Sequence, residues 1–196
     1  MSTSKSIRSH PKWSRLVDLV RELAFIDGGS DTAFTLASGR QSRWFFDTKP
    51  VMMHPEASHL IGEMLNLRMD ELGADFVGGL ELGAVPLTAI AVAMSSKDSP
   101  RRGFMVRKEP KGHGTGAWIE GPEFPEGTKV TVLEDVITTG GSAIKAVKQL
   151  RDVGYEVKRV VSIVDRQENG EADTAMKLAG LELISLYTLK DFIDEN

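Results

Sequence analysis

The chain has 196 residues, 41% of them hydrophobic and 27% charged, which is ordinary for a globular protein and predicts one well-cored domain. Its formal net charge of -4 argues against general nucleic-acid binding, because a phosphate backbone would be repelled on average. It has no cysteine and no apolar run near the roughly 20 residues of a membrane span, so disulfides, thiolate chemistry and membrane insertion are excluded and a cytoplasmic setting is expected.

Two elements are predicted before the main body of the chain. Leucines and a valine recur at helical spacing between residues 12 and 25, and they predict a helix that packs against the core. Two short β-prone runs then flank Ser38-Gly39-Arg40 and predict a hairpin-like excursion, which could form a lid or hood. Phe45 and Phe46 follow, and such aromatic residues either pack against hydrophobic neighbours or border a ligand.

Strands and helices alternate through the rest of the chain, which predicts an α/β fold with a mostly parallel central sheet flanked by helices. One domain is expected over residues 1–196, with the hood mainly from about residues 12–50 plus C-terminal residues and the core from about 55–187. The glycine-rich stretch after the first core strand lacks the dinucleotide fingerprint, so no Rossmann cofactor site is expected. The predicted helices cover residues 55–72, 86–94 and 171–178, and the predicted strands cover 75–79, 102–106, 157–164 and 182–187.

A basic loop is predicted over residues 107–121. It contains Arg107, Lys108, Lys111 and His113, set among glycines and a proline. This composition cannot bury a core and is typical of a mobile segment. The loop is either a solvated basic segment or a flap that closes over a polyanion, where it would exclude water and stabilise charge on a leaving group.

The most informative stretch is residues 130–142, VTVLEDVITTGGS. An apolar strand delivers Glu134 and Asp135 into a turn of Thr, Gly and Ser, and a helix is expected to start at Ser142. Backbone N–H groups converge at such a turn, and its two glycines let the main chain approach an anion. The turn is therefore predicted to hold a phosphate, while the two carboxylates accept hydrogen bonds from vicinal hydroxyls or face a metal.

Arg166 follows the valine-rich strand at 157–164. It is expected at the edge of the sheet where open parallel α/β folds bind ligands. Its planar guanidinium suits a carboxylate or an imide edge, although a structural salt bridge is a competing interpretation.

These segments resemble a known family. Residues 130–142 closely resemble the phosphoribosyl pyrophosphate (PRPP) signature of type I phosphoribosyltransferases, and the loop from Arg107 to Gly114 resembles the catalytic loop of orotate phosphoribosyltransferase. The resemblance continues through the hood, through residues 164–168 and through residues 188–191, so it covers nearly the whole chain from Leu16 onward in the same order.

The resemblance implies the type I phosphoribosyltransferase fold and transfer of the 5-phosphoribosyl group from PRPP to orotate, giving orotidine 5-phosphate and pyrophosphate in de novo pyrimidine (UMP) biosynthesis. It also implies Mg2+, held mainly by substrate oxygens and water, and a homodimer with a shared active site. The implied catalytic residues, which would contact the pyrophosphate, are Arg107, Lys108, Lys111 and His113. For the donor, the resemblance implies that Glu134 and Asp135 bind the ribose hydroxyls, with Val136 and Ile137 beside them, and that the 5-phosphate is bound by Thr138, Thr139, Gly140, Gly141 and Ser142. For the acceptor, it implies that Thr138 and Arg166 contact orotate and that Phe45 and Phe46 border it.

The chain departs from this pattern at two positions, because Ala37 and Gly83 stand where many members have a lysine. Two alternative functions stay open. The acceptor could be a purine or uracil, although a cation such as Arg166 favours the carboxylate of orotate. The protein could instead be a regulator that senses PRPP without turning it over, although the intact cationic loop and the negative net charge favour an enzyme.

Overall fold

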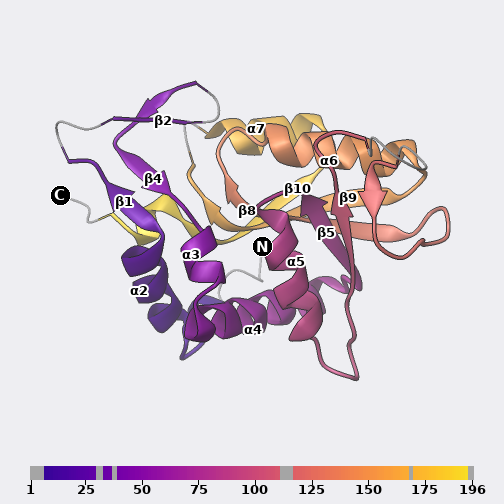
Figure 1. Cartoon of the computed structure of the whole chain (residues 1–196), viewed down its shortest axis with the longest axis horizontal. Helices are drawn as coiled ribbons and strands as arrows, with labels where there is room; N and C mark the ends of the chain where they lie inside the picture. Colours follow the sequence, from indigo (N-terminus) through magenta and orange to yellow (C-terminus); the bar gives the residue numbers. More distant parts are fainter. Residues whose placement is uncertain (1–6, 30–32, 37–38, 111–116, 168–169, 194–196) are drawn as a thin grey trace.

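The computed structural model describes residues 7–29, 33–36, 39–110, 117–167 and 170–193 (Figure 1). The helices are α2 (Trp13–Leu23), α3 (Lys49–Met52), α4 (Pro55–Leu72), α5 (Ala84–Ala93), α6 (Gly141–Asp152), α7 (Glu171–Leu178) and a 3-10 turn, Leu189–Asp191. The strands are β1 (Phe25–Asp27), β2 (Phe34–Thr35), β3 (Gln41–Ser42), β4 (Trp44–Phe46), β5 (Phe76–Leu80), β6 (Arg102–Val106), β7 (Ile119–Glu120), β8 (Lys129–Ile137), β9 (Glu156–Asp165) and β10 (Glu182–Thr188).

A six-stranded sheet in the order β10-β9-β8-β5-β6-β7 forms the centre of the fold. Its neighbouring strands are parallel except β7, which pairs antiparallel to β6. The inner strands β8 and β9 are rich in valine and isoleucine and almost continuously buried, as expected of parallel strands covered on both faces. The structure thus confirms the predicted α/β architecture with a mostly parallel sheet.

Helices cover both faces of this sheet, with α6 and α7 on one side and α4 and α5 on the other (Figure 1). Neighbouring residues of β8 point to opposite faces. Val132 packs in the cluster that includes Leu150 of α6, whereas Leu133 packs in the cluster that includes Met64 of α4. All four of these side chains are 0% exposed, so two hydrophobic layers enclose the strand that leads to the predicted phosphate turn.

The strands β1 to β4 make up the described part of the region expected to form the hood, and the C-terminal segment contacts them. The β2 and β3 strands pair antiparallel, which confirms the predicted hairpin, and β4 pairs with β1. The rings of Phe25 and Phe46 lie 5.1 Å apart, and Phe192 lies 5.2 Å from Phe46. The C-terminal segment therefore packs against the hood strands.

Several details differ from the sequence-based expectations. The strand β8 continues to Ile137, so Glu134 and Asp135 lie within the strand and not in the turn. Helix α6 begins at Gly141, one residue before the expected start, because the left-handed Gly140 caps it in place of a serine side chain. The short elements β1, α3 and β7 were not predicted. Among the described residues, no helix combines the length and apolar character needed to cross a bilayer.

Candidate functional site

The turn between β8 and α6 forms a hollow of about 230 Å3 at the carboxyl edge of the sheet. Gly140 has φ 84°, a left-handed backbone conformation that favours glycine. The first N–H groups of a helix have no acceptor within the helix, and they favour an anion. The hollow is lined by Glu134, Val136, Ile137, Thr138, Thr139, Gly140, Gly141, Ser142 and Ala143.

Glu134 is the buried member of the acidic pair beside this turn. It is 7% exposed, and its Oε2 has no hydrogen-bond partner among the described residues. Burial, followed by the adjacent charge of Asp135, raises the pKa of Glu134 to about 8. At neutral pH Glu134 therefore keeps its proton, and its carboxylic acid group can both donate and accept hydrogen bonds.

Asp135 is held by Thr48, a residue that the sequence did not single out, and it lies against Gly83. The hydroxyl of Thr48 donates a hydrogen bond to Oδ2 of Asp135 at 2.6 Å. A Cβ built at Gly83 would lie 2.4 Å from Oδ1 and 2.6 Å from Oδ2 of the same carboxyl group. In this conformation the Asp135 carboxyl group therefore fills the space that a side chain at position 83 would occupy. The sequence carries no signal for the Thr48 contact.

Arg166 lies at the carboxyl end of β9, as predicted, and is 3% exposed. Its backbone N–H donates to Ile137 O at 3.0 Å, which places it directly beside the end of β8. Its Nη2 donates to Ser42 Oγ at 2.7 Å and to Trp44 O at 2.8 Å. The guanidinium thus connects the ligand edge of the sheet to the hood. Burial also raises the pKa of the preceding carboxyl, Asp165.

The two phenylalanines predicted to border a ligand have different surroundings. Phe46 is 6% exposed and packs within the hood. Phe45 is half-buried, and its ring lies 5.6 Å from that of Phe34 in β2. Phe45 is therefore the more accessible of the two rings.

The base of the basic loop is anchored next to the same edge. Lys108 donates its backbone N–H to Glu81 Oε1 at 2.8 Å, and its carbonyl accepts from Lys145 Nζ at 2.6 Å. Arg107 forms an ion pair with Glu120 at 3.5 Å. Glu81 and Lys145 were not predicted as site residues, because only the fold brings them to Lys108. Lys111 and His113 lie outside the described residues.

The described part of the chain contains no group of three or more His, Asp or Glu side chains that could hold a metal ion. The acidic pair offers two carboxyl groups, and one of them is held protonated at neutral pH. Magnesium sites commonly use one or two carboxylates together with substrate phosphates and water. The donors present therefore fit a magnesium ion that arrives with a phosphorylated substrate.

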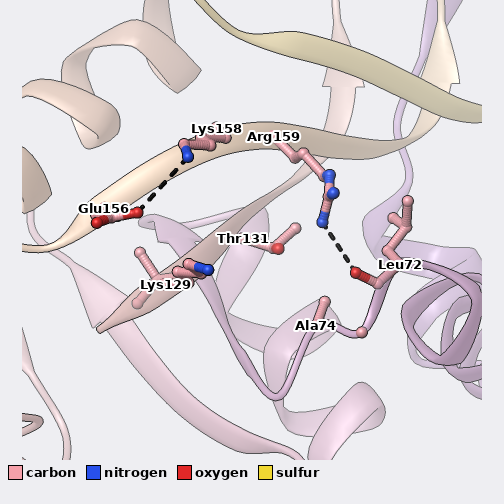
Figure 2. Close-up of a pocket in the computed structure, with 9 residues that line it drawn as sticks. Leu72, Ala74, Lys129, Thr131, Glu156, Lys158 and Arg159 are labelled. Carbon is pink, nitrogen blue, oxygen red and sulfur yellow. Dashed lines mark hydrogen bonds and ion pairs between the residues drawn. The ribbon is translucent and has the colours of Figure 1, made fainter. Parts of the chain in front are cut away.

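A second hollow, of about 280 Å3, lies at the amino edge of β8 and β9, far along both strands from the phosphate turn (Figure 2). It is cationic in composition, but Lys158 is turned toward Glu156 at 3.7 Å. Arg159 donates to Leu72 O at 2.9 Å, at the end of α4. Because Lys158 and Arg159 already have protein partners, this hollow is a weaker candidate for the functional site than the turn between β8 and α6.

Comparisons with known proteins agree with this geometry. No protein-family model matches the chain. An orotate phosphoribosyltransferase of Nostoc sp. is 43% identical over 178 residues, covering 90% of this chain and 83% of the relative. An orotate phosphoribosyltransferase of Bradyrhizobium sp. is 44% identical over 184 residues, covering 92% and 96% of the two chains.

Solved structures give the same result. A phosphoribosyltransferase from Corynebacterium diphtheriae superposes with a TM-score of 0.78 at 36% identity, covering 93% of this chain and 99% of the other. The Mycobacterium tuberculosis H37Rv orotate phosphoribosyltransferase in complex with PRPP superposes with a TM-score of 0.74 at 34% identity and the same coverage. With relatives above 40% identity over nine tenths of its length, the chain belongs to the orotate phosphoribosyltransferase family.

Proposed function

We propose that this chain transfers the phosphoribosyl group of PRPP to orotate, giving orotidine 5-phosphate and pyrophosphate, as a step of pyrimidine biosynthesis. The main support for this proposal is that three features lie together at the carboxyl edge of the sheet. They are the glycine-containing turn suited to bind an anion, the acidic pair Glu134 and Asp135, and the buried Arg166. A relative at 34% identity has been solved with PRPP bound, which supports the choice of donor.

The donor is proposed to lie along the end of β8. Its 5-phosphate accepts hydrogen bonds from the N–H groups and hydroxyls between Thr138 and Ser142, where Gly140 lets the backbone approach. The ribose hydroxyls lie against Glu134 and Asp135. A diol both donates and accepts, so a neutral acid next to a carboxylate is a suitable pair of partners.

Orotate is proposed to lie between the sheet edge and the hood. The guanidinium of Arg166 is already positioned by Ser42 and Trp44, and its positive charge complements the carboxylate of orotate. Thr138 would contact the same substrate from the turn, and Phe45 would cover one side of the ring. A pocket built this way favours an anionic pyrimidine over a purine or uracil.

The reaction needs charge stabilisation more than a covalent intermediate. As the orotate ring nitrogen attacks the anomeric carbon, pyrophosphate leaves and gains negative charge. We assign Arg107, Lys108, Lys111 and His113 to this leaving group. Glu81 and Lys145 support the role of the loop, because both hold the backbone of Lys108 beside the site.

Magnesium is proposed to enter with the donor. The donor's own oxygens and water would supply most of its ligands, and the Asp135 carboxylate is the available charged group at the ribose. When bound, the ion would neutralise part of the charge on the diphosphate.

The site is also proposed to be shared between two copies of the chain. Helix α5 is apolar around its whole circumference, although only part of it is buried in the fold. Its outer face, with Val85, Ala89 and Ala93, lines a groove of about 420 Å3 together with Met105 of β6. We propose that a second copy of the chain binds in this groove. Strand β6 borders the groove and leads directly into the basic loop, which each copy of such a dimer would contribute to the shared site.

The proposed activity is tested by incubating the purified chain with PRPP, magnesium and orotate and following the loss of orotate absorbance. Parallel reactions contain adenine, hypoxanthine or uracil. We expect kcat/KM for orotate to exceed that for uracil by at least about 100-fold, because Arg166 would lack its carboxylate partner. Adding EDTA should stop turnover. Preferential use of another base would contradict the acceptor, and PRPP binding without turnover would favour a regulator.

The state of Glu134 predicts a pH dependence of stability. Its pKa is raised in the folded protein, so between about pH 4.5 and 8 the folded state keeps a proton that the unfolded state releases. The free energy of unfolding therefore falls as pH rises through this window. In Glu134→Gln this fall should be smaller by about 3 kcal/mol between pH 5.5 and 8.5, measured by urea unfolding. Identical pH profiles for both proteins would show that Glu134 ionises normally.

The proposed dimer is tested by Ala89→Glu, which puts a charge on the outer face of α5. Sedimentation equilibrium should show a dimer for the parent chain and a monomer for the variant, with activity lost alongside. Leu178→Glu is the control, because Leu178 is 85% exposed on α7 and outside the groove, and it should stay dimeric. A parent chain that is monomeric at working concentration, or an Ala89→Glu variant that remains dimeric, would refute this interface.

A further inference from the structure

Thr48 lies at the junction between strand β4 of the hood and the short helix α3. It is 1% exposed, and its hydroxyl forms a hydrogen bond with a residue that is distant in the sequence. It donates to Asp135 Oδ2 at 2.6 Å, and the two residues are 87 positions apart in the chain. The single hydroxyl donor of this buried threonine is therefore bound to a carboxyl group at the proposed ribose site.

This contact restricts the orientation of the carboxylate. The last torsion of an aspartate side chain is soft, so an unrestrained carboxylate turns over a broad range. Here the hydrogen bond from the Thr48 hydroxyl fixes Oδ2, so it restricts rotation of the whole carboxyl group. Because Thr48 occupies one acceptor position, the remaining lone pairs stay available for hydroxyl donors.

We infer that Thr48 is a positioning residue for the donor: its hydroxyl orients Asp135 toward the ribose diol and ties the hood junction to the donor site. The inference rests on the proposed function, since it takes PRPP as the ligand of the acidic pair. Thr48 does not itself touch the substrate in this account. Its effect must therefore disappear when the ligand lacks the hydroxyls that Asp135 holds.

The test compares Thr48→Val, which removes the hydroxyl at nearly constant volume, with Thr48→Ser, which keeps it. Two competitive inhibitors against PRPP serve as probes: ribose 5-phosphate and its 2,3-dideoxy analogue. For Thr48→Val we expect the inhibition constant of ribose 5-phosphate and the KM for PRPP to rise about tenfold, the typical effect of losing a hydrogen bond to a charged group. The inhibition constant of the dideoxy analogue and the KM for orotate should stay within about twofold. Thr48→Ser should restore the parent values.

Each other outcome has a defined meaning. Equal weakening of both inhibitors by Thr48→Val, or failure of Thr48→Ser to restore binding, would show that Thr48 only supports the fold and would overturn the inference. No change for either inhibitor would overturn it as well. If ribose 5-phosphate fails to compete in the parent chain, the proposed donor site itself is wrong. The two failures are therefore distinguishable.

Discussion

The first N–H groups of α6 constrain the rest of the site, because they have no acceptor within the helix and Gly140 turns them toward the carboxyl edge of the sheet. Backbone geometry therefore sets where an anion would lie, and the hydroxyls of the turn add further donors. The long buried strand β8 holds the turn in place from two hydrophobic layers, one on each face. The rigid part of the fold thus fixes the phosphate end of the proposed donor, and the remaining residues act around that fixed point.

Two separate segments, the hood and the basic loop, approach this point and meet different parts of the proposed substrates. The hood reaches it through Thr48 and through the hydrogen bonds that Arg166 makes with Ser42 and Trp44. The basic loop reaches it through the backbone of Lys108. The hood is therefore connected to both the donor side and the acceptor side of the edge, so a shift of the hood would affect both proposed subsites together.

The parts of this arrangement that the sequence predicted are local or periodic. The signature at 130–142 is contiguous, so its turn could be located directly, and α4 and β6 have the bounds that their hydrophobic patterns indicated. The sequence underestimated the length of β8, because two adjacent carboxyl groups usually mark the end of a strand. Glu134 lies inside the strand because its raised pKa keeps the buried side chain uncharged at neutral pH. The contact between Thr48 and Asp135 depends on how distant segments pack, and no spacing along the chain encodes it.

We propose that the turn between β8 and α6 holds the 5-phosphate of PRPP while the acidic pair holds the ribose. A crystal structure of the protein with PRPP and magnesium tests it most directly. We expect the 5-phosphate within hydrogen-bond distance of backbone N–H groups between Thr138 and Ser142, with the ribose hydroxyls on Glu134 and Asp135. An empty turn with PRPP bound elsewhere, for example at the amino edge of the sheet, would contradict it.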